Sequence, residues 1–406
     1  MRRSSRTVRG ERLFITKGTL RILLTNSTDI YGGGEFYVLE LARALQSRHN
    51  DILVVCKPGN LLYKKCQEAQ LPVRALDFPG QGQLLRHILL LRDIIRERGI
   101  QIVHTNSNYD RTAGAFAARL SGAAHVTNVH SFHSLRHNLT HWLRNAAATD
   151  HFIVDGDPVK EMMVRKDRIA AGRISVVHLG VDPDSMRTDE TLRSKIRAEF
   201  RLDETHAVIG NVARFVPFKG HEFLLRAFEA VRNRNSNARL LLVGDGELRE
   251  RLLELARSLG IYREIVFAGF RDDLPAIYSA IDIYAHASIE GGGETFPFAV
   301  LQALAQELPV VATRVGDVAA MVRDGLTGFL VPERDTSELA QRLLSLSGDQ
   351  ILRRKMGRQG RELLLRQFTV NKMVDAVEKV YESTLQRRGR NIPSHVPRSG
   401  MGTSSN

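Results

Sequence analysis

The chain has 406 residues, of which 43% are hydrophobic and 25% are charged, as in an ordinary soluble globular protein. This length exceeds what a single hydrophobic core usually covers, so two domains are expected. The sequence contains no apolar run near the ~18–20 residues of a membrane helix, and its start does not resemble a secretory signal. Its formal charge of +13 favours an anionic partner, which could be a nucleic acid, an acidic membrane surface or a charged substrate.

After a basic arm at residues 1–18, the first half of the chain alternates short apolar runs with helical patterns. Strands that alternate with helices of this kind indicate βαβ units and a parallel sheet, so a doubly wound α/β domain is predicted. The strands are expected at Arg21–Asn26, Ile52–Cys56, Val73–Leu76, Ile102–Thr105, Val126–His130, His151–Val154 and Ile174–His178, with helices at Phe36–Arg48, Leu84–Glu97 and Arg111–Leu120.

The second half repeats the same architecture. Its strands are expected at Ala207–Asn211, Leu240–Gly244, Ile265–Ala268, Ile281–Ala287, Val310–Thr313 and Gly328–Val331, with helices at His221–Arg234, Leu352–Leu365 and Val370–Leu385. The predicted units are a flexible arm (1–18), a first domain (19–183), a second domain (184–367), a C-terminal helix (368–386) and a tail (387–406). The tail is rich in Arg, Ser, Gly and Pro and is expected to be disordered.

One stretch of the second half, residues 286–305, joins a buried strand through three glycines to a helix that opens near Pro297. Unpaired amides and the helix dipole make such a helix start suitable for an anion such as a diphosphate. Glu294, followed by Thr295 and Phe296, lies at the mouth of this helix start, and Gln302 lies further along the helix wall. A surface turn with solvated polar side chains is the alternative interpretation.

Two basic residues follow the first strand of the second domain. Arg214 comes just after this strand, and Lys219 opens the next helix. Ligands of open α/β sheets bind at the C-terminal ends of the strands, so the two cations are placed to clamp a diphosphate. Solvated surface residues would show the same pattern.

Other turns at strand ends are also glycine-rich. The loop containing Gly33, Gly34 and Glu35 does not match the G-x-G-x-x-G fingerprint of nicotinamide-binding folds, and indicates either close approach to a ligand or a surface turn. Turns at Gly244 and at Phe270-Arg271 border a nucleotide base or serve as structural connections.

Five histidines, His125, His130, His133, His137 and His141, fall in one segment. The last three have helical spacing, but no carboxylate or cysteine partner accompanies them, so no metal site is predicted. His130 ends a strand, where a general base or sugar-binding group would lie, although a buried structural histidine is equally compatible.

The segment Ser134–Arg144 predicts an amphipathic helix with an apolar stripe of Leu135, Leu139, Trp142 and Leu143, and with Arg136, His137 and Arg144 outside it. A basic amphipathic helix carrying the only tryptophan can dock on an anionic membrane. The alternative is that the stripe packs on its own domain.

In combination, these pieces resemble the retaining GT-B glycosyltransferases of glycosyltransferase family 4. The resemblance spans about residues 20–385 and rests on four motifs in order: a GG-x-E-type loop at Gly33-Gly34-Glu35, an R-x4-K pair at Arg214 and Lys219, a VG-x-G turn around Gly244, and an E-x7-E signature at Glu294 and Gln302. The family implies two Rossmann-like domains that face each other across a cleft, with the C-terminal helix crossing back to the first domain.

The resemblance also implies residue roles. Arg214 and Lys219 would hold the donor diphosphate, Glu294 the donor sugar and Gln302 the ribose, while His130 would line the reacting centre. The glycine loop would lie near the diphosphate. The signature departs from the family pattern at Gln302, because glutamine stands where the second glutamate is expected and offers an uncharged carbonyl.

The expected function is therefore the transfer of a hexose-type unit, without a metal or cofactor, from a nucleotide sugar to a glycolipid or oligosaccharide acceptor, a precursor of surface polysaccharide. Two cysteines without a disulfide framework fit a cytoplasmic enzyme, peripheral at the inner face of the membrane. A catalytically silent sugar-nucleotide-binding protein and a GT-B epimerase or phosphorylase are the alternatives. Nucleic-acid binding is disfavoured, since no recognised module accompanies the charge.

Overall fold

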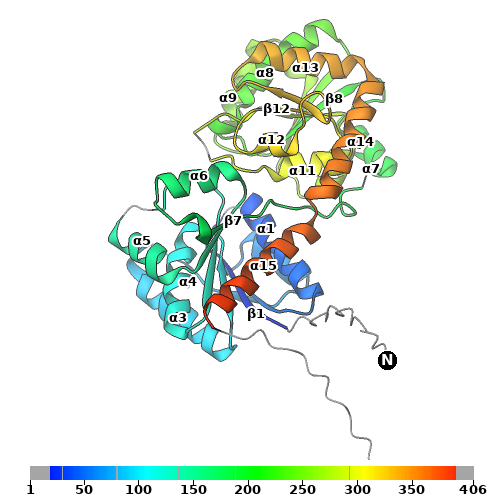
Figure 1. Cartoon of the computed structure of the whole chain (residues 1–406). Coiled ribbons are helices and arrows are strands. Elements are labelled where there is room, and N and C mark those ends of the chain that lie inside the picture. The colour runs from blue at the N-terminus through cyan, green and yellow to red at the C-terminus, as the bar shows by residue number, and fades with distance from the viewer. Residues whose placement is uncertain are drawn as a thin grey trace, which may run out of the picture.

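The computed structural model describes residues 19–389 except 30, 79–80, 136–137, 188 and 292. The predicted basic arm and residues 390–406 of the predicted tail lie outside this part. The described chain forms two α/β domains, each built on a wholly parallel sheet (Figure 1). None of its helices is long and apolar enough to cross a bilayer.

The first sheet has seven strands in the order β3-β2-β1-β4-β5-β6-β7. Its strands are β1 (Arg21–Asn26), β2 (Asp51–Cys56), β3 (Val73–Ala75), β4 (Ile102–Thr105), β5 (Ala124–Val129), β6 (His151–Val154) and β7 (Ile174–Val176). Its helices are α1 (Gly33–Ser47), α2 (Leu61–Glu68), α3 (Leu84–Glu97), α4 (Asn108–Ser121), α5 (Leu139–Leu143) and α6 (Asp157–Arg165). Central strands such as β4 are buried along their whole length because helices cover both faces.

The second sheet has six strands in the order β10-β9-β8-β11-β12-β13. Its strands are β8 (Ala207–Val212), β9 (Ala238–Val243), β10 (Ile265–Gly269), β11 (Ile283–His286), β12 (Val310–Thr313) and β13 (Gly328–Val331). The helices here are α7 (Glu190–Glu199), α8 (His221–Arg234), α9 (Arg249–Ser258), α10 (Leu274–Ser279), α11 (Phe298–Ala305), α12 (Val318–Met321), α13 (Thr336–Gly348) and α14 (Gln350–Gln367). The predicted fold class, two parallel-sheet α/β domains, is confirmed. The boundary predicted at 183/184 falls between β7 and α7 and stays a prediction.

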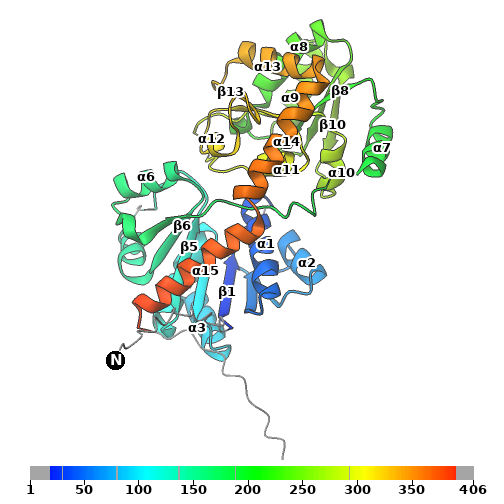
Figure 2. The same cartoon turned by 45° about the vertical axis from the view of Figure 1, so that its right-hand side comes forward.

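The last helix, α15 (Val370–Arg387), returns to the first domain. It packs against α1 and β5, and both views show it lying along the first domain (Figures 1 and 2). Arg48 at the end of α1 donates to Asp375 at 2.6 Å and to Glu378 at 3.1 Å, while Tyr381 is fully buried. The first domain is therefore completed by residues from the far end of the chain.

Several predicted elements differ from the structure by a few residues at their ends, and two of these differences lie near the predicted site residues. The first helix begins at Gly33 rather than at Phe36, because the Glu35 carboxylate accepts the Gly32 N–H at 2.8 Å and satisfies one of the free amides of the first turn. The predicted strand Ile281–Ala287 is shortened to Ile283–His286. Both differences are small, and the helix start changes the position of two glycines assigned to the site.

Candidate functional site

The second domain contributes a buried cluster of charged and polar side chains around Glu294. Lys219 forms an ion pair with Glu294, whose carboxylate also accepts from Ser288 Oγ at 2.7 Å and lies 3.4 Å from His286 Nε2. Burial alone raises the pKa of a carboxyl group, but the contacts with Lys219 and His286 outweigh it and hold the pKa of Glu294 well below its usual range. Glu294 is therefore a buried, ionised carboxylate.

A glycine turn fixes Lys219 in this position. Gly220 has a φ of +65°, and a Cβ atom there would lie 1.9 Å from the Ala287 carbonyl oxygen. A side chain at Gly220 is therefore excluded, and the turn after Lys219 packs directly on the backbone that follows β11. This close approach brings the end of β8 and the end of β11 together.

Arg214 stands apart from the cluster. Its side chain is exposed, and within the described part of the chain no hydrogen-bond or ion-pair partner is found for it. The loop that carries it is held by Gly244, which has a φ of +140° and whose added Cβ would meet the Ala213 carbonyl oxygen at 2.0 Å. Gly244 thus shapes the arginine loop, whatever else it contacts.

Gln302 faces the interior of the second domain. It is 5% exposed, and its side-chain carbonyl accepts from Tyr278 Oη at 3.3 Å. Tyr278 also donates to the Ala299 carbonyl oxygen at 3.0 Å, so one hydroxyl lies near two acceptors on α11. Gln302 lies on the same helix that begins next to Glu294, as the spacing predicted.

The turn after β10 holds the last two residues assigned to donor binding. Phe270 is 58% exposed, and Arg271 forms ion pairs with Asp273, at 2.6 Å, and with Glu199. The guanidinium also lies over the Phe200 ring at 5.6 Å. These contacts tie the turn to α7, and the role of both residues in base binding stays a prediction.

The first domain contributes His130, which directly follows β5. Its Nδ1 lies 2.8 Å from Asp155, a carboxylate that is 1% exposed at the end of β6, and its Nε2 lies 3.3 Å from Asn128 Nδ2. The Tyr37 ring meets the imidazole edge-on, with ring centroids 5.2 Å apart. The imidazole is thus held on three sides and remains 19% exposed.

The loops from the two domains meet at this point. Thr295 Oγ1 donates to Asp155 Oδ2 at 3.1 Å, and the rings of Phe36 and Phe298 pack edge-on with centroids 4.9 Å apart. The starts of α1 and α11 are therefore adjacent, and a Cβ on Gly33 would lie 3.4 Å from Phe298. The structure thus brings the predicted first-domain loop and the Glu294 loop together.

Two further predicted residues line this junction. A Cβ on Gly34 would lie 4.0 Å from His130 Cδ2, so the glycine faces the imidazole. Phe296 is 3% exposed, stacks on His178 with ring centroids 5.0 Å apart, and packs on Phe368. Its contacts are those of a core side chain between the domains, and its predicted part in donor binding remains untested.

Asp155, Ser288 and His286 belong to this site but were not assigned from the sequence. Asp155 and Ser288 both lie within two residues of the end of a buried strand, the same position that selected His130 and Arg214. A systematic search for polar residues at strand ends would have included them. His286 is the last residue of β11 and also matches this rule, although a histidine at the end of an apolar strand is usually structural.

The predicted amphipathic helix Ser134–Arg144 is wrong in part. The helix α5 spans only Leu139–Leu143 and continues as a π-helical turn, Arg144–Ala148, and Leu135 is buried outside the helix. Arg144 is also buried, because its guanidinium donates to the Leu135 carbonyl oxygen at 2.9 Å and to Thr112 Oγ1 at 3.0 Å. Arg136 and His137 lie outside the described residues.

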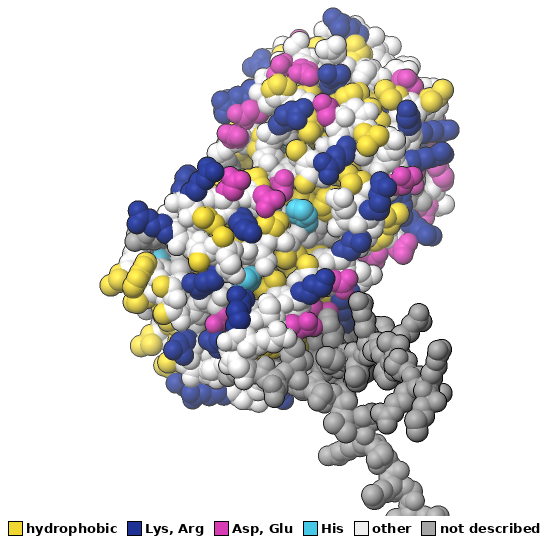
Figure 3. Space-filling model, in the orientation of Figure 1, with side chains coloured by type: hydrophobic (Ala, Val, Ile, Leu, Met, Phe, Trp, Pro, Cys, Tyr) yellow, Lys and Arg dark blue, Asp and Glu magenta, His cyan; other side chains and the backbone are white. Residues whose placement is uncertain are grey.

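The remaining stripe on α5 is open to solvent. Leu139, Trp142 and Leu143 are 71%, 46% and 42% exposed. Hydrophobic side chains gather at this edge of the first domain, with Lys and Arg side chains beside them (Figure 3). Of the clustered histidines, His125 lies on β5 and contacts Thr105 and Thr149, and the described residues contain no group of His, Cys, Asp or Glu arranged to hold a metal.

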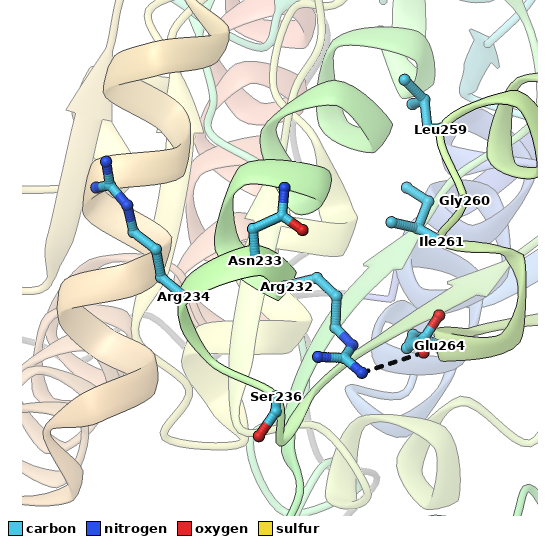
Figure 4. Close-up of a pocket in the computed structure, with 8 residues that line it drawn as sticks. All are labelled: Arg232, Asn233, Arg234, Ser236, Leu259, Gly260, Ile261 and Glu264. Carbon is cyan, nitrogen blue, oxygen red and sulfur yellow. Dashed lines mark hydrogen bonds and ion pairs between the residues drawn. The ribbon is translucent and has the colours of Figure 1, made fainter.

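A pocket of about 420 Å³ lies elsewhere, between the C-terminal end of α8 and the turn after α9 (Figure 4). It is lined by Arg232, Arg234 and Glu264, and Arg232 donates to Glu264 at 3.2 Å. Lys219 precedes the opposite end of α8, about 20 Å away at 1.5 Å per residue. This pocket is therefore separate from the junction of the two domains.

Two family models match the chain: Glycosyltransferase Family 4 at residues 31–185 and Glycosyl transferases group 1 at residues 193–363. The chain is 25% identical over 392 residues to the UDP-Gal:alpha-D-GlcNAc-diphosphoundecaprenol alpha-1,3-galactosyltransferase of Escherichia coli, an alignment that covers 90% of this chain and 97% of the relative. It is 29% identical over 295 residues, 68% of this chain and 74% of the relative, to the GDP-mannose-dependent alpha-(1-6)-phosphatidylinositol monomannoside mannosyltransferase of Mycobacterium tuberculosis (strain ATCC 25618 / H37Rv).

Among solved structures, Anabaena Alr3699/HepE in complex with UDP and glucose superposes with a TM-score of 0.79 at 21% sequence identity, covering 90% of this chain and 100% of the other. The two family models together span both sheets, and the relatives that match along most of the chain are glycosyltransferases. The protein therefore belongs to the GT-B glycosyltransferases of glycosyltransferase family 4.

Proposed function

We propose that this glycosyltransferase moves a hexose-type sugar from a nucleoside diphosphate sugar to a lipid-linked acceptor, with retention of configuration and without a metal ion. The observation that carries the proposal is the hydrogen bond from Thr295 to Asp155, at 3.1 Å. It places the Glu294 loop of the second domain beside His130 of the first. Donor and acceptor bound on opposite domains would meet at this point.

The second domain supplies the positive charge that a departing diphosphate requires. Lys219 lies beside Glu294 near the start of α11. Arg214 follows β8, is exposed, and has no hydrogen-bond or ion-pair partner for its side chain among the described residues. A diphosphate there would be held by a guanidinium fork, an ammonium and helix amides. In this arrangement Glu294 contacts the donor sugar, Gln302 contacts the ribose, and the turns at Gly244 and at Phe270-Arg271 border the base.

The chemistry follows from these roles. The bond between the sugar C1 and the diphosphate oxygen breaks, and the acceptor hydroxyl oxygen bonds to C1 on the same face. The proton of that hydroxyl passes to the departing phosphate oxygen. No protein nucleophile takes part, and His130 orients a sugar hydroxyl at the reacting centre. Stabilisation of the leaving negative charge is then the main contribution of the protein.

The relatives support both substrate classes. One is named for a UDP-sugar donor and an undecaprenol diphosphate acceptor, another for a GDP-mannose donor and a phosphatidylinositol mannoside, and the Anabaena neighbour holds UDP and glucose. An acceptor anchored in a bilayer requires the enzyme to work at the membrane surface. The exposed Leu139, Trp142 and Leu143 and the formal charge of +13 fit docking at the inner face of the cytoplasmic membrane.

A donor panel tests the transfer reaction. Purified protein is incubated with radiolabelled UDP-glucose, UDP-galactose, UDP-N-acetylglucosamine or GDP-mannose and extracted bacterial membrane lipids. We expect one donor to give labelled lipid, with the rate unchanged by EDTA. Nucleotide binding without transfer from any donor would instead favour a silent binding protein, and loss of activity in EDTA would refute metal independence.

Vesicle binding tests the membrane surface separately. The protein should co-sediment with vesicles containing phosphatidylglycerol and dissociate as salt rises, because screening weakens surface attraction. Replacing both Leu139 and Trp142 by Ser should weaken binding about tenfold or more with little loss of thermal stability, since neither residue belongs to the buried core. Equal binding of this variant and the wild type would remove α5 from the membrane contact.

A further inference from the structure

A chain of buried hydrogen bonds runs from the returning helix α15 to the junction of the domains. It begins at Tyr381 on α15, crosses His104 on β4 and Asn128 on β5, and ends at His130 and Asp155. The links are Tyr381 Oη to His104 Nδ1 at 2.6 Å, His104 Nε2 to Asn128 Oδ1 at 3.0 Å, Asn128 Nδ2 to His130 Nε2 at 3.3 Å, and His130 Nδ1 to Asp155 Oδ2 at 2.8 Å. The first three side chains and Asp155 are at most 1% exposed.

The chemistry of the groups gives this chain one direction. Burial lowers the pKa of His104 to about 3, so this imidazole is neutral and has one donor and one acceptor nitrogen. The Asn128 carbonyl oxygen faces His104 Nε2 and can only accept, so Nε2 carries the proton, and Nδ1 is left to accept from the Tyr381 hydroxyl. The amide nitrogen of Asn128 then points at His130 Nε2 as a donor.

The same logic selects one tautomer of a neutral His130. Its Nε2 faces a donor and must accept, and its Nδ1 faces the acceptor oxygens of Asp155 and must carry the proton. The 3.3 Å contact with Asn128 is long, and the ring is 19% exposed, so the Nε2 lone pair remains able to accept from a sugar hydroxyl. Every donor in the chain points toward Asp155.

We propose that Tyr381, His104 and Asn128 are positioning residues that hold His130 as the Nδ1–H tautomer, with Nε2 ready to accept a substrate hydroxyl. The inference rests on the role proposed above for His130. The far end of the chain strengthens the case, because Asp155 also accepts from Thr295 of the second domain at 3.1 Å. His130 is thus held correctly only when α15 is docked and the two domains are in contact.

This arrangement gives the returning helix a function beyond packing. The Tyr381 hydroxyl lies at one end of the chain, while the other apolar groups of α15 fill the core whether or not that hydroxyl is present. Removal of this single oxygen leaves His104 Nδ1 without its donor. The neutral imidazole can then exchange its tautomer, turn its N–H away from Asn128 and release the amide that fixes His130.

Nuclear magnetic resonance tests the tautomer without any need for activity. Protein labelled with ¹⁵N in its histidines is recorded near pH 7.5, and the His130 signal is identified by its loss in His130→Gln. We expect the wild type to show protonated Nδ1 and unprotonated Nε2 at His130, and Tyr381→Phe to show a mixture of both tautomers. An Nε2–H tautomer in the wild type, or an unchanged His130 spectrum in Tyr381→Phe, would overturn the inference.

Kinetics provide the second test. Tyr381→Phe should lower kcat about tenfold, a change of about 1.4 kcal/mol, and leave the KM for the donor within about twofold. The control is Thr384→Val, which removes another buried hydroxyl of α15. This hydroxyl donates to the Val380 carbonyl oxygen and accepts from Arg387, both on α15, and is not part of the hydrogen-bond chain. It should leave kcat unchanged. A parallel loss of kcat in Thr384→Val would indicate general loosening of α15 and would contradict a specific positioning role.

These outcomes separate the inference from the proposed function. Full activity in His130→Ala would refute the role of His130 itself, whatever the spectra show. A large loss in His130→Ala together with unchanged kcat in Tyr381→Phe would keep the proposed function and refute the positioning chain.

Discussion

The two domains repeat one architecture but carry different chemistry at the ends of their strands. In the second domain, Lys219 and Glu294 form a buried ion pair, with Arg214 exposed beside it. In the first domain the side chains that contact His130 are mainly neutral, and the carboxylate among them, Asp155, accepts from His130 and from Thr295. Charge suits a diphosphate, whereas neutral donors and acceptors suit sugar hydroxyls. In the proposed function, the same fold would therefore serve two binding roles through a few residues at strand ends.

Breaking the ion pair of the second domain should have the largest effect. Lys219→Met leaves the Glu294 carboxylate buried without its partner, so the free energy of unfolding should fall by about 3 kcal/mol and turnover should nearly disappear. The double variant Lys219→Met/Glu294→Gln should regain most of the stability but not the turnover. Urea denaturation and initial rates measure both effects. Wild-type stability in the single variant would mean that the pair is effectively solvated.

Arg214 separates catalysis from stability in the same domain. Because its side chain is exposed and has no described partner, Arg214→Ala should lower turnover about 10²-fold and leave the urea midpoint unchanged. Arg226→Ala on the exposed face of α8 removes the same charge and is the control. If both variants reduce turnover equally, Arg214 acts through net charge and does not contact the diphosphate.

Acid should destabilise both domains through buried histidines. Burial lowers the pKa of His104 and of His221 to about 3, whereas an unfolded histidine titrates near 6.5. Below pH 6.5 the unfolded chain binds protons that the folded chain excludes, so the free energy of unfolding should fall by about 1.4 kcal/mol per histidine and pH unit.

The two histidines sharpen the comparison, because His221 has no hydrogen-bond partner among the described residues while His104 has two. His221→Phe should therefore be tolerated at pH 7.5 and should reduce the loss of stability between pH 6.5 and 5, as measured by urea denaturation at each pH. His104→Phe should already be destabilised at pH 7.5. An unchanged pH slope in His221→Phe would show that this histidine becomes protonated in the folded protein.

Gln302 should give the smallest effect. A charged acceptor forms stronger hydrogen bonds than a neutral one, so Gln302→Glu should tighten donor binding by roughly 1 kcal/mol, or about fivefold, and Gln302→Ala should weaken it. Tyr278→Phe is the control, because it removes the buried hydroxyl that donates to Gln302 and leaves Gln302 itself in place. Calorimetric titration of the active donor decides the matter, and unchanged affinity in both Gln302 variants would remove this residue from the ribose site.

The fold could be predicted from the sequence because the central strands of both sheets are short, buried runs of mainly apolar residues. Ile102–Thr105 and Val310–Thr313 were predicted with the bounds that the structure has. The apolar residues of α5 could also be recognised in the sequence. The burial of Arg144 could not, because its guanidinium is held by the backbone carbonyl of Leu135 and by the hydroxyl of Thr112, which lies on another helix. No local pattern signals such contacts.

The same limit applies to the candidate site. Arg214, Lys219 and His130 were selected because ligands of parallel α/β sheets bind at the C-terminal ends of the strands, and the roles of these residues remain predictions. The contacts that organise them depend on the tertiary fold: Thr295 is 140 positions from Asp155, and Tyr381 is 277 positions from His104. Periodicity and spacing report on neighbours within about one element, so contacts of this range require the structure.

The return of α15 also sets the order in which the polypeptide finishes folding on the ribosome. Val374, Val377 and Leu385 share one core with α1 and β1, so that core stays open until the last helix emerges. At about 5–20 residues per second, synthesis of the intervening domain delays this step by roughly 10–40 s. During that interval the uncovered apolar face of the first domain is available to chaperones. A polypeptide truncated before α15 would keep this face exposed, so it should aggregate rather than form an independent half-enzyme.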